Sequence, residues 1–380
     1  MNRRYLLLQI NRFFVSGEPL HSYGGIFLQS TMKKGVLDNP RVIARLDPSG
    51  MLGAVDSSPE LLLNPLSMEN RQRITIDQEI EQIVFGGVGG SAIAADVIID
   101  WLIDRLKIPA VVVRDARLPR FVNKTTLVVA LSYSGETTET LSLYKAAKSR
   151  DCLAFAISTG GRLIDLCRRY ERPFLTIRPS VSPRSALYQM VSACSIVLKE
   201  AGLASRLLPA VGEAAKEISV LRRLYTSTND SSGNKAKQFA YSLKDNLPVV
   251  YALQRMGCVA RRFKNQLNEN SKIPAKFDLL PESGHNEIEA WHEANNLTPV
   301  LIRDSGESAF ESKIMDGFRS TIKEATKTEA LDVRIRSKSR LGGLLCPIFF
   351  LDYVSIYLAF LRGVDPTPTA LIKEFRKSIS

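Results

Sequence analysis

Two buried-strand patterns in the first half of the chain each lead into a turn of small or hydroxylated residues and then into a helix pattern. The first apolar run, at 83–85, breaks at the glycines of GGVGG, and helix periodicity begins at Ser91. The second run, at 127–131, ends in SYSGETT before helix periodicity resumes at Leu141. In a parallel sheet such turns lie at the same carboxyl edge. The pattern therefore predicts one crevice that both turns line.

Both turns have the chemistry of a phosphate site. Glycine lets backbone N–H groups approach an anion closely, and a helix N-terminus adds positive potential. Hydroxyl groups can donate hydrogen bonds to phosphate oxygens without adding charge. The hydroxyl candidates are Ser91, Ser132, Ser134 and Thr137. This lining suits a monophosphate.

Two other interpretations of these turns stay open. The first turn also fits a variant dinucleotide pattern, Gly87-x-Gly89-x-x-Ala92, with Asp115 as the ribose ligand. Clusters of serine and threonine also serve simply to cap helices. A dinucleotide site does not need the second turn, and no lysine follows the glycines as it does in a nucleoside-triphosphate loop.

Length and composition narrow the class of protein. A chain of 380 residues suits about two domains, and 45% apolar with 24% charged residues is ordinary for a soluble globular protein. The five cysteines are scattered singly, which predicts reduced core residues in a cytoplasmic protein. Three histidines are too few for a His-rich metal centre. The longest apolar run, at 344–361, carries Asp352 and predicts a buried helix rather than a membrane span.

The formal net charge of +12 allows two interpretations. It could indicate affinity for a polyanion, or a basic surface that attracts small anionic substrates. No helix-turn-helix or aromatic RNA-binding motif accompanies the charge. We therefore expect a small anionic substrate and no nucleic-acid or membrane partner.

The patterns divide the chain into three parts. Residues 1–37 are expected to form a basic extension, although translation could instead begin at Met32. Residues 38–225 should form a first domain and 226–380 a second one, each a mostly parallel, doubly wound sheet flanked by helices. The expected strands are 81–85, 109–114, 126–131, 152–158, 173–178, 248–253, 298–303 and 331–336. The expected helices are 91–105, 136–149, 161–170, 184–202, 208–224, 259–269, 309–326, 341–363 and a final basic helix.

Four motifs, SYSGETTET, PRSALYQM, NENSKIPA and HNEIEAW, occur in this order. Together they resemble the bifunctional phosphoglucose/phosphomannose isomerase family, whose members have two sugar-isomerase (SIS) domains. The resemblance covers about 39–380. It implies interconversion of glucose 6-phosphate, and of mannose 6-phosphate, with fructose 6-phosphate through a cis-enediol. It also implies a homodimer in which His285 reaches into the neighbour's site. No metal or cofactor is expected, because the hydrogen moves as a proton.

The resemblance assigns roles to residues of this chain. Gly90, Ser91, Ser132, Ser134 and Thr137 would hold the sugar phosphate, and Arg184 would lie near the reacting carbons. Glu269 would be the base, His285 would open the ring, and Thr369 would give room for either C2 epimer. The family's lysine in the final helix falls on Arg376, with Lys373 and Lys377 on either side. Arginine stays protonated and cannot exchange a proton, so Lys377 or Lys373 could take that task.

The reaction needs these residue types in any case. One carboxylate placed over C1 and C2 can shuttle the proton, a fixed cation can stabilise the enediolate, and a histidine can open the ring. Glu287 and Glu289 are rival carboxylates close to His285. A non-catalytic sugar-phosphate sensor built on the same domains is the alternative function. It would have the two phosphate turns without a working Glu269 and His285.

Overall fold

The computed structural model describes residues 35–66, 78–292 and 294–378 and divides the chain into two compact units. The N-terminal unit is Gly53–Ser219. The C-terminal unit joins the described part of Met1–Leu52 to Val220–Ser380, and the division falls within helix α9 (Leu207–Tyr225). Most of the expected basic extension, including Met32, lies outside the described residues.

The N-terminal unit contains one sheet of five parallel strands in the order β2-β1-β3-β4-β5. Gly87 pairs with Leu131, so β1 and β3 end level with each other. This neighbouring pair is the point where the strand order reverses, the usual place for a ligand in such sheets. The strands are β1 (Gln82–Gly87), β2 (Ala110–Val113), β3 (Thr126–Leu131), β4 (Leu153–Ser158) and β5 (Phe174–Thr176).

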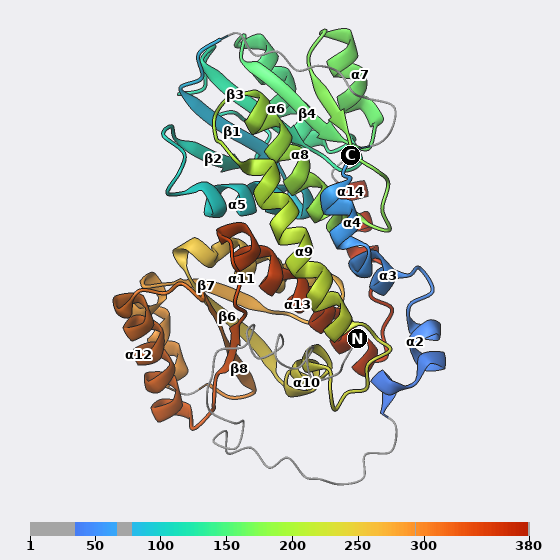
Figure 1. Ribbon diagram of the computed structural model, residues 1–380, viewed down its shortest axis with the longest axis vertical. Coiled ribbons are helices and arrows are strands. Elements are labelled where there is room, and N and C mark those ends of the chain that lie inside the picture. Colours follow the sequence, from blue (N-terminus) through green and yellow to red (C-terminus); the bar gives the residue numbers. More distant parts are fainter. Residues whose placement is uncertain (1–34, 67–77, 293, 379–380) are drawn as a thin grey trace. The chain divides into compact units, whose positions relative to one another are not determined.

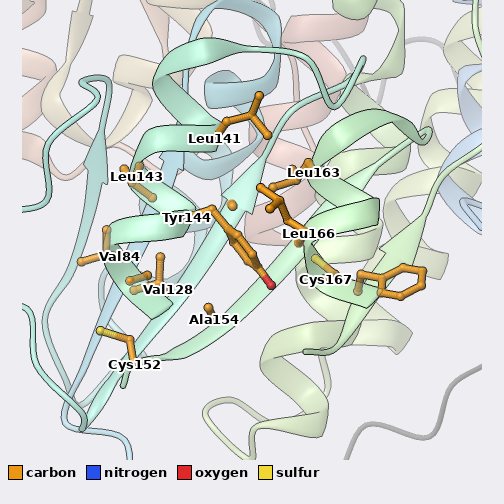
Figure 2. Packing of buried hydrophobic residues seen from close by; sticks show 14 of the residues in the cluster. Val84, Val128, Leu141, Leu143, Tyr144, Cys152, Ala154, Leu163, Leu166 and Cys167 are labelled. Carbon is orange, nitrogen blue, oxygen red and sulfur yellow. The ribbon is translucent and has the colours of Figure 1, made fainter. Parts of the chain in front are cut away.

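Helices cover both faces of this sheet, which explains why its strands are continuous apolar runs. Val84, Val128 and Ala154 point to one face, where they pack against α6 (Thr138–Ser149) and α7 (Gly161–Arg169) (Figure 2). Side chains alternate along a strand, so the intervening residues face the opposite side. There α5 (Gly89–Leu102) packs on α8 (Leu187–Glu200) (Figure 1).

The C-terminal unit contains a second parallel sheet, in the order β7-β6-β8-β9. Its order repeats that of the first four strands of the other sheet, so the predicted fold class of two doubly wound domains is confirmed. The strands are β6 (Leu247–Leu253), β7 (Lys276–Leu280), β8 (Leu297–Arg303) and β9 (Leu331–Arg334). The flanking helices are α10 (Lys235–Ser242), α11 (Gly257–Glu269), α12 (Ala309–Thr326) and α13 (Arg340–Leu361).

Some elements were not predicted from the sequence. Strand β7 and helix α10 are absent from the expected list, as are the short helices before the first sheet. These short elements are η2 (Val36–Asp38), α2 (Pro40–Leu46), α3 (Met51–Asp56) and α4 (Ser58–Leu63). Each is too short to show a clear apolar period in the sequence.

Helix α13 is long and apolar enough, by composition alone, to cross a membrane, but 94% of its most apolar window is buried in the structure. Its single carboxylate, Asp352, accepts two hydrogen bonds of 3.0 Å from Arg262 of α11. Both side chains are buried, so each charge has its partner within the core. The prediction of a buried helix is therefore confirmed. All five cysteines are also buried, and none is in a disulfide, as predicted.

A buried lysine anchors the first described segment to the C-terminal unit. Lys237 is completely buried, and its ammonium donates to the Leu37 carbonyl at 2.6 Å and to Asp38 at 3.1 Å. Asp38 also accepts hydrogen bonds from the N–H and hydroxyl of Ser231. Burial alone would raise the pKa of Asp38, but the hydrogen bonds from Ser231 and Lys237 outweigh it and lower that pKa.

We predict that Asp38→Asn lowers the free energy of unfolding at pH 7 by about 1 to 3 kcal/mol, the usual contribution of a charged hydrogen bond. Because the folded-state pKa is lowered, the carboxylate's contribution is fully present above the unfolded pKa of about 4 and is lost as pH falls through the folded value. Urea unfolding between pH 7 and pH 3 measures this. Asp245→Asn, at an exposed position, is the control. A difference of the same size at pH 3 would contradict the ion-pair account.

Candidate functional site

The turn after β1 brings a helix N-terminus to the strand-order reversal. Gly89 has a φ of +56°, and the cap residue of α5, Val88, makes no side-chain cap hydrogen bond. A Cβ at Gly87 would lie 2.7 Å from the Leu131 carbonyl oxygen, so only glycine permits this close approach to β3. The first-turn N–H groups of α5 therefore provide positive potential without a charged side chain.

The turn after β3 is built from hydroxyl groups. Ser132 donates to the Thr137 hydroxyl at 3.0 Å and accepts from the Gly135 N–H at 3.1 Å. Thr137 is the cap residue of α6 and makes no side-chain cap hydrogen bond. Ser134 is exposed at the tip of the turn. Gly135 has a φ of +70°, and a Cβ there would lie 1.9 Å from the Gly160 carbonyl oxygen.

Direct contacts join the two turns and a third segment. The Tyr133 N–H donates to the Ser91 hydroxyl at 3.1 Å, which links the β3 turn to α5. Arg184 lies in the short helix η3 (Pro183–Ala186) and is almost fully buried. A Cβ at Gly90 would come within 3.1 Å of the Arg184 Cα, so η3 packs against the first turn of α5. The predicted binding residues of the N-terminal unit are thus gathered at one place.

The equivalent edge of the C-terminal sheet has a different character. Its helix α12 is capped by its own side chains, since Ser308 accepts from the Glu311 N–H and Glu311 accepts from the Ser308 N–H. Burial would raise the pKa of Glu311, but the hydrogen bonds with Ser308 and the charges of Arg255 and Arg340 together outweigh it and lower that pKa. Asp304, which follows β8, pairs with Arg255 and Arg340. The carboxylates at this edge already pair with its arginines, and the N-terminus of α12 is already capped. The turns after β1 and β3 are therefore the better phosphate site.

Glu269 is the last residue of α11 and is partly buried. The two residues after it are fixed to α13. Asn270 donates to the Ser355 hydroxyl at 2.9 Å, and the Ser271 hydroxyl donates to the Ser355 carbonyl at 2.6 Å. All three of these partners are buried. The helix end that carries Glu269 therefore has a defined position within its unit.

Lys272 brings two of the predicted segments together. Its ammonium donates to the carbonyl of Glu269 and to the carbonyls of Pro366 (3.2 Å) and Pro368 (2.6 Å). Thr369, the predicted specificity residue, follows Pro368 directly and is partly buried. Sequence reasoning gave Lys272 no role, although it lies within the NENSKIPA motif. Nothing in the local sequence shows that two of its three acceptors, the carbonyls of Pro366 and Pro368, lie more than ninety residues away.

His285 ends the short helix η5 (Glu282–His285) and is exposed. It lines a surface hollow of about 210 Å³ together with residues of η5, η6 (Glu287–Trp291) and α12. The rival carboxylate Glu287 is engaged elsewhere. It accepts from the Tyr251 hydroxyl at 2.7 Å and pairs with Lys276, so it fixes the start of η6 to β6 and β7. The other rival, Glu289, is exposed.

The final helix α14 (Ala370–Ser378) carries Lys373, Arg376 and Lys377, all exposed. A period of 3.6 residues places these three cations on one face, with Leu371 and Phe375 on the opposite face. Although Arg376 stands at the family's lysine position, Lys373 and Lys377 lie on the same face of α14. All three cations therefore stay candidates for the catalytic role.

Two further observations concern other ligands. In the described ranges, His, Cys, Asp and Glu side chains form no group of three that could hold a metal ion. Asp115, the ribose ligand of the dinucleotide interpretation, accepts a hydrogen bond of 3.0 Å from the Arg117 N–H within its own turn.

Comparison with known proteins identifies the relatives of this chain. The model of the bacterial phospho-glucose isomerase C-terminal SIS domain matches residues 232–379. A bifunctional phosphoglucose/phosphomannose isomerase from Caldicellulosiruptor bescii is 32% identical over 337 residues, covering 87% of this chain and 99% of the relative. One of the same name from Aquifex aeolicus is 30% identical over 300 residues, covering 78% of this chain and 90% of the relative.

Solved structures show the same fold. The C-terminal domain of glucosamine-fructose-6-phosphate aminotransferase from Francisella tularensis superposes with a TM-score of 0.61 at 17% identity. The match covers 83% of this chain and 96% of that one. At this identity the likeness concerns the fold alone.

We predict that Gly135→Ala weakens the binding of fructose 6-phosphate at least about 10-fold, because the new Cβ must displace the backbone of Gly160 and distort the turn. Gly202→Ala is the matched control. Its φ of +67° is almost the same, but apart from its two chain neighbours no described residue has an atom within 4 Å of the added Cβ. It should cost about 1 kcal/mol of stability and leave binding unchanged. Calorimetric titration and urea unfolding measure both effects, and equal binding by the two variants would contradict the role of this turn.

Proposed function

Because the chain belongs to the bifunctional phosphoglucose/phosphomannose isomerase family, we propose that it interconverts glucose 6-phosphate and mannose 6-phosphate with fructose 6-phosphate. It is a sugar-phosphate isomerase, and the reaction moves a proton between C1 and C2 through a cis-enediol. The observation that carries the proposal is the pair of helix N-termini at the end of β1 and β3, surrounded by hydroxyl groups. A sugar monophosphate matches that lining.

In this scheme the phosphate lies on the N-terminal unit. Gly90 and the hydroxyl groups of Ser91, Ser134 and Thr137 donate to its oxygens. Ser132 is buried and gives its own proton to Thr137, so it orients the Thr137 hydroxyl rather than donating to the phosphate itself. The neutral donors bind the ground state and the transition state equally, so they contribute affinity rather than rate. A phosphate fixed in this way holds C1 and C2 at a constant distance from the turns after β1 and β3.

Glu269 acts as the base that carries the proton between C1 and C2. Its position at the end of α11, fixed by Asn270 and Ser271, supports this role because a shuttle must reach two adjacent carbons without moving far. The hydrogen bond and ion pair of Glu287 make it a weaker candidate. General-base catalysis of this kind contributes about 10² to 10⁴-fold in rate.

Arg184 stabilises the negative charge that develops on the enediolate oxygens. A guanidinium stays charged, and a buried one interacts strongly with a nearby anion because little water screens it. Charge stabilisation of this kind acts in the transition state more than in the ground state and therefore raises kcat.

His285 opens the sugar ring, because an imidazole can donate or accept a proton near neutral pH. Arg376 supplies a fixed positive charge, and Lys377, on the same face of α14, exchanges the proton that arginine cannot. Lys377→Arg tests these two roles. Full turnover by that variant would show that position 377 contributes only a positive charge and exchanges no proton. Thr369 gives room for either epimer at C2, which allows both aldose products.

We also propose a homodimer in the cytoplasm that needs no cofactor. The exposed position of His285 supports its reaching into the site of a second copy. Five buried cysteines that form no disulfide suit a reducing compartment. Recovery of the activity in the membrane fraction of broken cells would contradict this location.

Subunit mixing tests the dimer. Glu269→Gln and His285→Ala should each lower turnover strongly. If His285 acts on the neighbour's substrate, a mixed dimer of the two variants contains one intact site, and random reassociation should restore about a quarter of the normal activity. Activity equal to the sum of the two separate variants would show that each chain uses its own histidine.

Glu269→Gln tests the base. The amide has the same shape but cannot accept the proton, so kcat should fall about 10² to 10⁴-fold while the Kd for fructose 6-phosphate changes less than about 3-fold. Glu324→Gln, on the exposed face of α12, is the control and should behave as the normal protein does. Retained turnover by Glu269→Gln would move the base to another carboxylate.

A further inference from the structure

Tyr133 uses its backbone to join the turns that follow three strands. It lies between Ser132 and Ser134 in the turn after β3. Its N–H donates to the Ser91 hydroxyl of α5 at 3.1 Å. Its carbonyl accepts from the N–H and the hydroxyl of Thr159, at 2.9 and 2.7 Å, in the turn after β4. These backbone contacts do not depend on the type of side chain.

The hydroxyl of Tyr133 makes a separate connection. It accepts from the N–H of Ser180 at 2.8 Å and donates to the carbonyl of Ser180 at 2.6 Å. Ser180 lies in an irregular segment after β5, where none of the described strands pairs with it. One phenolic hydroxyl therefore satisfies both backbone polar groups of Ser180, as a neighbouring strand would. Phenylalanine would fill the same space without either bond.

Ser180 is in turn connected to the segment that carries Arg184. The Ser180 and Ser185 hydroxyls are 2.8 Å apart. Ser185 also donates to the Ser182 carbonyl at 2.7 Å and accepts from the Ser182 N–H at 3.0 Å, closing the start of η3. Arg184 lies inside this closed turn, and its backbone packs on Gly90.

We propose that Tyr133 is a positioning residue for the isomerase reaction. Its hydroxyl holds the 180–185 segment against the turn after β3 and thereby fixes the position of Arg184 relative to that turn. The inference rests on the proposed function and adds a residue to it. The hydrogen bonds of the Tyr133 hydroxyl lead to the Arg184 segment through Ser180 and Ser185. Its effect should therefore appear in the step that Arg184 serves, the stabilisation of the enediolate, more than in phosphate binding.

Tyr133→Phe tests the proposal, with Tyr170→Phe as the control. Tyr170 is a partly buried tyrosine packed on the core of the same unit. Tyr133→Phe should lower kcat about 10- to 100-fold, the usual effect of a small misplacement of a catalytic group, and change KM less than about 3-fold. Tyr170→Phe should leave both constants unchanged. Normal kinetics for Tyr133→Phe, or a loss confined to KM, would overturn the proposal.

A double-mutant cycle separates positioning from an independent role. If Tyr133 acts through Arg184, the double variant Tyr133→Phe/Arg184→Gln should be no slower than Arg184→Gln alone. A further loss equal to that of Tyr133→Phe in the normal background would show that the tyrosine acts by another route.

Amide hydrogen exchange tests the positioning role of Tyr133 without relying on isomerase activity. Tyr133→Phe should speed exchange in peptides that cover 178–187 and leave the β1 peptide unchanged, whether or not the protein isomerises fructose 6-phosphate. Unchanged exchange in 178–187 would overturn the positioning role even in an active enzyme. An inactive normal protein with faster exchange in the variant would overturn only the proposed function.

Discussion

The level ends of β1 and β3 are the constraint on which the rest of the site depends. The strand order β2-β1-β3-β4-β5 makes these two strands neighbours and sends the chain after them in opposite directions. Two helices therefore begin at the same place, and neither cap residue blocks its helix N-terminus with a side-chain hydrogen bond. The N-termini of α5 and α6 give this place a positive potential without charged side chains, and hydroxyl groups complete its lining. A phosphate is the group that such a place binds best.

The two sheets show that topology alone does not make a ligand site. The C-terminal sheet has the same order over four strands, yet Ser308 and Glu311 cap its α12 and Asp304 pairs with arginines at the same edge. The duplicated fold thus supports different chemistry in its two copies. We propose that the N-terminal unit binds the phosphate and that the C-terminal unit supplies Glu269 and His285, the acid–base residues that the family resemblance assigns.

Much of the fold could be predicted from the sequence because buried parallel strands are continuous apolar runs. All five strands of the first sheet show this pattern, and both phosphate turns follow from it. Strand β7 does not, since it lies at the edge of its sheet and alternates Lys276 and Asp278 with apolar residues. Helix α10 follows a polar stretch, and it carries a buried lysine, Lys237. That lysine can be buried because Asp38 and backbone carbonyls accept hydrogen bonds from its ammonium. The roles of Tyr133 and Lys272 depend on acceptors distant in sequence, which no local pattern displays.

We propose that this chain moves a proton between C1 and C2 of a sugar phosphate and produces both epimers. The decisive experiment is to incubate the purified protein with fructose 6-phosphate in the presence of EDTA and to separate the products by chromatography. We expect both glucose 6-phosphate and mannose 6-phosphate to form. Binding of fructose 6-phosphate with neither product formed would contradict the claim and leave the fold as that of a sugar-phosphate sensor.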